Sequence, residues 1–282
     1  MDSPQLNALL LAILAALLAA GRNYWLKATD ARLLLYGASN AVCFGIAIIL
    51  LPFVTMPAPA SMALLCVSSL IYTIYTLFQL HAFRTLDISR LEPLQRSMRI
   101  GVMAICSTLL LGESISTTQL FALVLAFAGI NMLIDWRYFS QKANIGSIAK
   151  CCFAGILGGM LTLSDVIGIR ISGAPLGYIV WNLFIGIPVV ILALVYHHKE
   201  LSVFLKARLR NTVMMCSCDV LSYGLVLFIL YGLQVGQALP LLNVSVIFTA
   251  FLGMRYLDET VSKQNWAAIV LVTLSISTVQ LI

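Results

Sequence analysis

The chain has 282 residues, of which 61% are hydrophobic and only 10% are charged. Soluble domains carry about 25% charged residues, so this composition excludes a water-exposed globular surface and indicates an integral membrane protein. The net charge of +6 is spread over loops between apolar runs, which argues against a polyanion site, and we expect no nucleic-acid partner.

Long apolar runs divide the chain. A helix needs roughly 20 apolar residues to cross about 30 Å of hydrocarbon. Ten such runs follow one another: 6–26, 33–53, 61–83, 93–111, 118–134, 146–168, 177–196, 212–231, 235–254 and 265–282. The first run has no basic residues before it, so we interpret it as a retained helix rather than a cleaved signal peptide. The expected fold class is all-α integral membrane, with ten transmembrane helices and both termini on one side.

Basic residues are concentrated in alternate loops. The loops after odd-numbered runs hold Arg22, Lys27, Arg32, Arg84, Arg90, Arg137, Lys142, Lys199, Lys206, Arg208, Arg210, Arg255 and Lys263. The other loops hold only Arg170. Because cytoplasmic loops carry the excess of Lys and Arg, this predicts cytoplasmic odd-numbered loops and exoplasmic termini, in the cell (inner) membrane.

Seven cysteines lie within or beside the apolar runs. Buried free thiols that act as small hydrophobes explain such positions. The Cys216-Ser217-Cys218 group near Asp219 matches no common zinc spacing. The sequence therefore predicts no metal site and no cofactor.

The second half of the chain repeats sequence features of the first half. LGESIS (Leu111 to Ser116) and LDETVS (Leu257 to Ser262) occupy matching positions between runs, and a Pro-Leu pair precedes each, at Pro93 and Pro240. Five crossings change sides, so a second five-helix unit must insert upside down. We expect two inverted repeats, 1–140 and 141–282, an arrangement common among secondary transporters.

Several segments resemble one family. They are GRNYWLKA (21–28), HAFRTLDISRLEPLQRS (81–97), LTLSDVIGIRISGAPLGYIVW (161–181) and the LGES and LDET junctions. Together they resemble the drug/metabolite transporter superfamily, in particular its ten-helix EamA-type members. The resemblance implies alternating-access transport of small solutes, often export of amino acids, related metabolites or drugs.

Four charged residues stand out inside apolar runs: Arg96, Arg99, Asp165 and Asp219. Charge inside hydrocarbon is costly, so each is a candidate for function. Arg96 and Arg99 share a helix face, but an arginine near a helix start also snorkels to the surface. The two acids either bind an amine or a proton or pair with an arginine: Asp165 with Arg170 or a neighbouring helix, Asp219 with Arg96 or Arg99.

Aromatic and amide side chains add weaker candidates: Tyr72, Tyr75, Trp181, Tyr223 and Asn243. Tyrosine and tryptophan also form interfacial belts, and an intramembrane asparagine also bonds neighbouring helices. The GxxxG spacing of Gly155 and Gly159 indicates close helix packing.

These residues favour a secondary active transporter, an exporter in particular, of a small polar metabolite such as an amino acid or a related zwitterionic or anionic compound. Arg96 would meet a carboxylate, while Asp219 or Asp165 would meet an amine or a coupling proton; a counter-substrate is the alternative. The sequence predicts no catalytic residues, but an integral-membrane enzyme acting on a lipid-linked substrate is the competing function. Monomer and homodimer both stay open.

Overall fold

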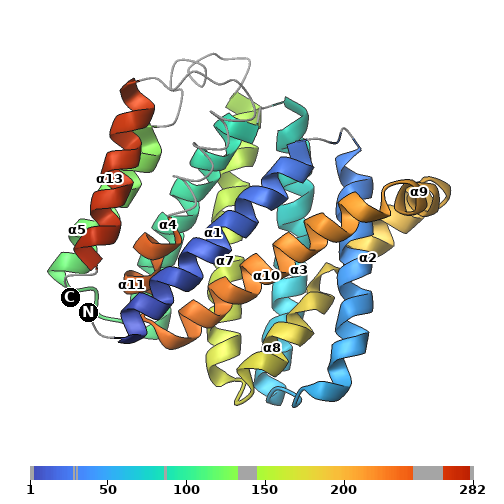
Figure 1. Cartoon of the computed structure of the whole chain (residues 1–282), viewed down its shortest axis with the longest axis horizontal. Coiled ribbons are helices and arrows are strands. Elements are labelled where there is room, and N and C mark those ends of the chain that lie inside the picture. Colours follow the sequence, from blue (N-terminus) through green and yellow to red (C-terminus); the bar gives the residue numbers. More distant parts are fainter. Residues whose placement is uncertain are drawn as a thin grey trace.

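The chain is almost entirely helical in the residues that the computed structural model describes, which are 3–27, 29, 31–85, 88–132, 145–243 and 263–279 (Figure 1). The helices are α1 (Ser3–Lys27), α2 (Arg32–Leu50), α3 (Pro59–Thr85), α4 (Ile88–Leu111), α5 (Thr117–Met132), α7 (Ile145–Ile171), α8 (Pro175–Asn182), α9 (Ile187–Ala207), α10 (Leu209–Gly232), α11 (Val235–Leu242) and α13 (Lys263–Val279). Short 3₁₀ helices, η1 (Leu51–Phe53) and η3 (Leu183–Gly186), follow α2 and α8. The LDETVS segment lies outside the described residues.

Within those residues, five helical stretches are long and apolar enough to cross a membrane. They are Arg32–Phe53, Pro59–Ala82, Ile145–Ile171, Pro175–His197 and Leu209–Gly232, with shorter apolar stretches at Asn7–Arg22, Thr117–Met132 and Trp266–Ser275. Each of the ten expected runs is helical in most of its described part, but ten crossings stay a prediction.

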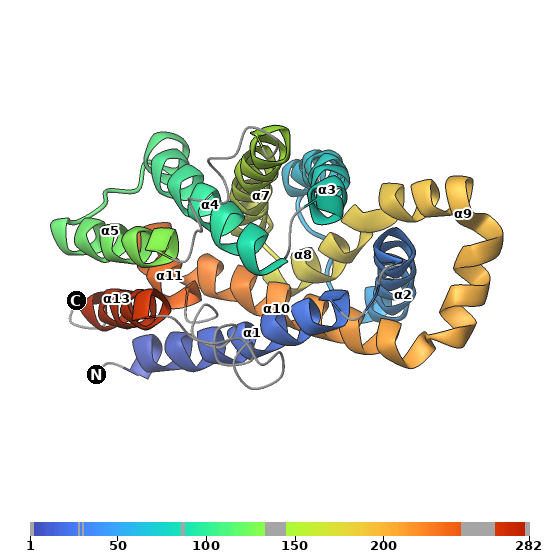
Figure 2. The same cartoon turned by 90° about the horizontal axis from the view of Figure 1, so that it is seen from above.

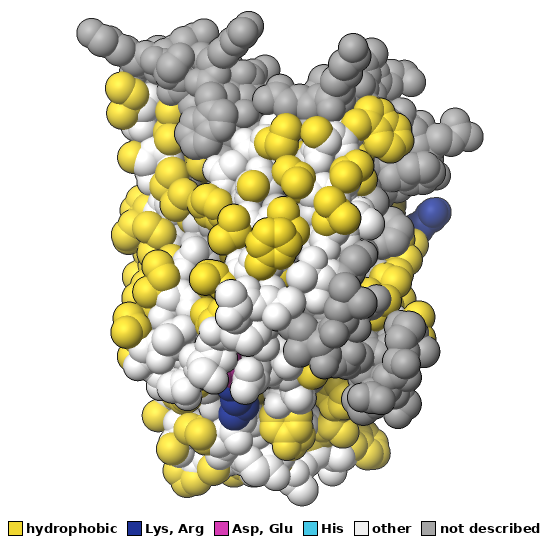
Figure 3. All heavy atoms as spheres, turned by 90° about the vertical axis from the view of Figure 1, so that its left-hand side faces the viewer, with side chains coloured by type: hydrophobic (Ala, Val, Ile, Leu, Met, Phe, Trp, Pro, Cys, Tyr) yellow, Lys and Arg dark blue, Asp and Glu magenta, His cyan; other side chains and the backbone are white. Residues whose placement is uncertain are grey.

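Large apolar side chains cover the outside of the bundle. On α5 and α13 they include Phe121, Val124, Trp266, Val270 and Leu274, each at least half exposed. Figure 3 shows the side of the molecule that these two helices form, where apolar side chains predominate and few charged ones are visible. Such a surface is stable in hydrocarbon and not in water, so it identifies a multi-pass membrane protein.

The seventh run departs from the expected single helix over 177–196. It consists of α8, η3 and α9, with the break just before Pro188. Proline has no N–H for the carbonyl four residues earlier, and its ring crowds that carbonyl, so the regular helix cannot continue. A second kink occurs at His197, where φ is −141° and ψ is 37°, and the rest of α9 bends around α2 towards α10, with Leu201 packed against Ala38 (Figure 2).

The two halves of the chain interleave. The most extensive helix contacts join one half to the other: α1 with α10, α2 with α9, α3 and α4 with α7, and α5 with α13. Gly155 and Gly159 allow the contact with α4, because added Cβ atoms would lie only 2.8 Å from the carbonyl oxygen of Gln95 and 3.2 Å from that of Arg99. This geometry favours the packing interpretation of the GxxxG spacing.

Candidate functional site

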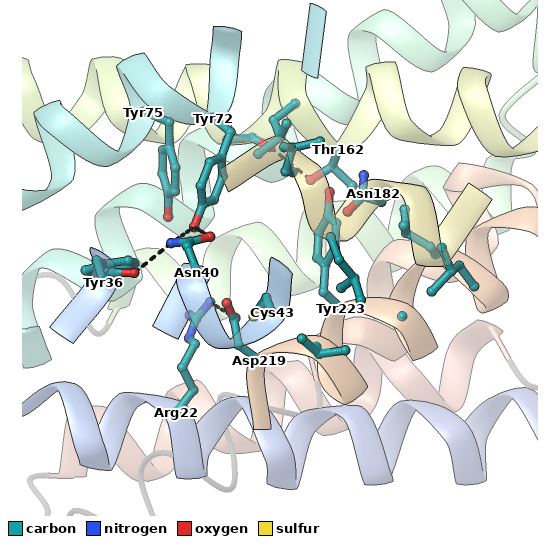
Figure 4. Close-up of a pocket in the computed structure, with 18 of the residues that line it drawn as sticks. Arg22, Tyr36, Asn40, Cys43, Tyr72, Tyr75, Thr162, Asn182, Asp219 and Tyr223 are labelled. Atoms are coloured by element: carbon teal, nitrogen blue, oxygen red, sulfur yellow. Dashed lines mark hydrogen bonds and ion pairs between the residues drawn. The ribbon is translucent and has the colours of Figure 1, made fainter. Parts of the chain in front are cut away.

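A polar pocket with a volume of about 110 Å³ lies among helices of both halves (Figure 4). Its polar lining comprises Arg22, Tyr36, Asn40, Cys43, Tyr72, Tyr75, Gln79, Arg99, Thr162, Asn182, Asp219 and Tyr223. Of the residues that the sequence singles out, Tyr72, Tyr75, Arg99, Asp219 and Tyr223 therefore meet in one place.

Asp219 on α10 pairs with Arg22 on α1. The guanidinium Nη1 donates to the carboxylate at 3.1 Å, and the two side chains are 28% and 32% exposed. The sequence offers Arg96 or Arg99 as the partner of Asp219. The predicted run 6–26 already includes Arg22, and what the sequence does not show is that this end of α1 packs against α10, which brings Arg22 beside Asp219.

Residues of α2 and α3 that are joined by hydrogen bonds form one wall of the pocket. The Tyr36 hydroxyl donates to Gln79 Oε1 at 3.0 Å, and the Asn40 amide nitrogen lies 3.3 Å from the Tyr72 hydroxyl. The sequence interpretation misses Tyr36 and Asn40. Their spacing of four residues inside an apolar run is the signal that could have found them, because it puts two polar groups on one helix face.

Arg99 lies at the centre of α4, about 16 Å along the helix from its first residue. Its Nη2 lies 3.5 Å from the Tyr75 hydroxyl, the outer limit of a hydrogen bond, and its buried Nε has no hydrogen-bond partner. Gly158 on α7 makes room for it, since a Cβ there would lie 2.9 Å from Nη2. The pocket wall thus holds a guanidinium that is only weakly satisfied.

Asp165 is fully buried behind the pocket lining. Its Oδ1 accepts hydrogen bonds from Ser68 at 2.5 Å and Tyr178 at 3.0 Å, and its Oδ2 accepts one from Tyr223 at 2.6 Å. It does not pair with Arg170. Because Tyr223 lines the pocket while Asp165 does not, this carboxylate orients a pocket tyrosine, which favours the structural interpretation of Asp165.

Besides Asp165, three further sequence candidates lie outside the pocket lining: Arg96, Trp181 and Asn243. The Trp181 ring packs on Phe184, with centroids 5.4 Å apart. The Asn243 amide donates to the carbonyl of Leu239 at 2.9 Å at the end of α11. Arg96 precedes Arg99 by three residues on α4.

A second ion pair lies where α4, α7 and α10 end and α11 begins. Arg170 donates to Glu113 Oε1 at 2.7 Å and to the carbonyl oxygens of Leu230 and Leu233 at 3.0 and 2.8 Å. Glu113 Oε2 accepts the backbone N–H of Val235 at 2.8 Å. We call this group of five residues the clamp. It satisfies helix-end groups that would otherwise lack partners, and it ties the first half to the second.

The clamp and the Arg22–Asp219 pair lie at separate positions along α10, at Leu230 and Asp219 respectively. At 1.5 Å per residue, these positions are about 16 Å apart along the helix. The two halves are therefore joined electrostatically at two separate points.

A bundle of apolar helices with a polar pocket at its centre is the architecture of proteins that move solutes across membranes. Residues 145–280 match the model of the EamA-like transporter family. This match covers the second half of the chain and confirms the resemblance to EamA-type drug/metabolite transporters seen in the sequence. The members of this family are membrane transporters, so the match implies a membrane transporter with a small-molecule substrate.

The fold recurs among solved structures. One chain, titled "Crystal structure of protein", superposes with a TM-score of 0.71 over 98% of this chain and 98% of its own, at 12% identity. At that identity the likeness concerns the fold alone. No curated protein matches the chain.

Proposed function

We propose that the protein is a secondary active transporter, and specifically an exporter, of a small polar metabolite such as an amino acid or a related zwitterionic or anionic compound. One observation carries this proposal: polar side chains from both halves line a single pocket within an otherwise apolar bundle. A pocket between two halves can open to either side of the membrane when the halves move.

The packing of the helices supports two inverted repeats, 1–140 and 141–282. In these repeats α1 corresponds to α7, α2 to α8 and α9, α3 to α10, and α5 to α13. Exchanging each helix for its counterpart turns the contact of α1 with α10 into that of α7 with α3. The contacts of α2 with α9 and of α5 with α13 map onto themselves. Such a pattern is what a pseudo-twofold axis in the membrane plane would produce.

The direction of the helices supports the inversion. The backbone N–H of Ala58, in the link after α2, donates to the carbonyl of Ser172, just after α7. α7 therefore ends on the side where α2 ends, which is also the side where α1 begins (Figure 1). α1 and α7, the first helices of the two halves, run in opposite directions.

Two alternating states follow from this arrangement. The clamp holds the halves together on the side where α7 and α10 end, which the charge distribution assigns to the exterior. In the opposite state these bonds would open and the other side would close around the pocket. A proton or a counter-substrate would supply the driving force.

Filling the pocket tests the proposal. Thr162 lines the pocket, and its hydroxyl donates to the carbonyl of Gly158, one turn earlier on its own helix. We expect Thr162→Trp to reduce solute release from proteoliposomes at least tenfold while the protein stays folded. Thr108→Trp is the matched control, because the hydroxyl of the exposed Thr108 makes the same bond, to Ala104, on the outside of α4. Equal release by the two variants would refute the pocket as the transport site, and turnover of a lipid substrate without any release would favour the enzyme.

A further inference from the structure

The charges that line the pocket do not cancel. They come from Arg22, Arg99 and Asp219. Arg22 and Asp219 neutralise each other at 3.1 Å. Among the described residues Arg99 has no acidic partner within ion-pairing distance, so the lining carries one excess positive charge near the centre of the bundle.

An excess charge at this depth is costly unless a counter-charge enters the pocket. None of the described groups that contact Arg99 supplies one. Its Nη2 reaches only the Tyr75 hydroxyl, at 3.5 Å, and its Nε has no partner. Gly158 leaves the space in which the guanidinium sits.

Neither nearby carboxylate is available for a ligand ammonium group. Asp219 is engaged by Arg22, and Asp165 is enclosed by Ser68, Tyr178 and Tyr223 behind the lining. A cationic or zwitterionic solute would therefore have to break an existing bond in order to place its amine. An anion needs only Arg99.

We propose that the pocket selects small organic anions, whose oxyanion group, a carboxylate or a phosphate monoester, binds Arg99. This inference rests on the proposed transport function and narrows its substrate class. The planar guanidinium can donate two parallel hydrogen bonds to such a group, which adds geometric selectivity to the charge. The tyrosine hydroxyls and the Asn40 amide in the same lining offer hydrogen bonds to the rest of the ligand.

Binding is measured first, separately from transport. The purified protein is heated in the presence of lactate, lactamide, alanine or a small phosphate monoester, four probes of similar size that differ in charge. We expect the anions alone to raise the unfolding temperature, and the stronger of the two to identify the oxyanion. Arg99→Gln should raise the half-saturating concentration about 10- to 100-fold, because a hydrogen bond to a charged group is lost. Arg208→Gln, which removes an exposed arginine of the α9–α10 link, should leave it unchanged.

A second variant keeps the arginine and moves it. The Cβ of Gly158→Ala would lie 2.9 Å from Arg99 Nη2 and 3.1 Å from Nε, so the flexible guanidinium must shift. We expect weaker anion binding with an unfolding temperature close to that of the wild type in the absence of ligand. Anion binding unchanged by both Arg99→Gln and Gly158→Ala would overturn the assignment of Arg99.

Transport is measured in proteoliposomes loaded with an equimolar mixture of small anions, zwitterions, amines and polyols. Mass spectrometry of the released solutes should show anions only, and release should be lost with Arg99→Gln. Release of zwitterions or amines that is insensitive to Arg99→Gln would leave the transport function standing and refute the anion site. Anion binding without any release would support the anion site and refute the transport function. If no anion raises the unfolding temperature, the anion site is refuted.

Discussion

Arg170→Met is expected to lower the free energy of unfolding by about 3 kcal/mol. The substitution removes the partner of a carboxylate whose side chain is only 9% exposed, and leaving one member of a buried pair costs about 3–5 kcal/mol. We expect the lower end of this range because the Arg170 side chain is 26% exposed. Two carbonyl groups, of Leu230 and Leu233, lose their donor at the same time.

The double variant Glu113→Gln/Arg170→Met distinguishes a clamp from a general packing defect. With the acid neutralised, no unpaired charge remains, so the double variant should be more stable than Arg170→Met alone. Unfolding by denaturant, measured for the wild type, both single variants and the double variant, gives the coupling energy. Strictly additive losses would contradict the clamp. Solute flux should be lower than in the wild type in both Arg170→Met and the double variant, because both lack the clamp bonds that close the side where α7 and α10 end.

Asp219→Asn is expected to reduce solute flux at least tenfold. The change frees the charge of Arg22, so the pocket lining would carry two excess positive charges instead of one. A bound anion would then be held too tightly to leave, and the half-saturating concentration should fall together with the maximal rate. Initial rates of release over a range of solute concentrations measure both quantities.

Removing both members of the pair separates two roles for Asp219. In Arg22→Gln/Asp219→Asn the lining again carries one excess positive charge, and we expect flux to recover to within severalfold of the wild type. If Asp219 instead carried the coupling proton, the double variant would be as defective as Asp219→Asn. Recovery of flux in the double variant would therefore indicate that Asp219 balances the charge of Arg22. A double variant as defective as Asp219→Asn would contradict this role.

The positions of the helices could be predicted from the sequence because hydrocarbon leaves a chain few choices. A backbone without water must bond to itself, so long apolar runs become helices. The predicted run 33–53 and the helical stretch Arg32–Phe53 differ by one residue. The break in the seventh run could not be predicted in this way. Pro188 can be read from the sequence, but whether a proline interrupts a helix depends on the local backbone.

The pocket could be predicted only in part, because its residues meet through tertiary packing. Arg99 and Asp219 stand out as charges within apolar runs, whatever their neighbours are. Arg22 lies near the end of the first run among other basic residues, and only the structure shows that this end of α1 packs on α10. Likewise, nothing in the sequence near Glu113 indicates that Arg170 lies beside it, since the two are brought together by the ends of four helices.

Labelling of a pocket cysteine tests the central claim most directly. Thr162→Cys, in a chain whose own cysteines are replaced by serine, puts one thiol in the pocket, and Thr108→Cys on the outside of α4 is the control. A membrane-impermeant thiol reagent is added to vesicles of either orientation. If the pocket opens alternately to the two sides, Thr162→Cys will be labelled from both, and breaking the clamp with Glu113→Gln/Arg170→Met will increase labelling from the clamp side only. Labelling from one side alone, unchanged when the clamp is broken, would contradict alternating access.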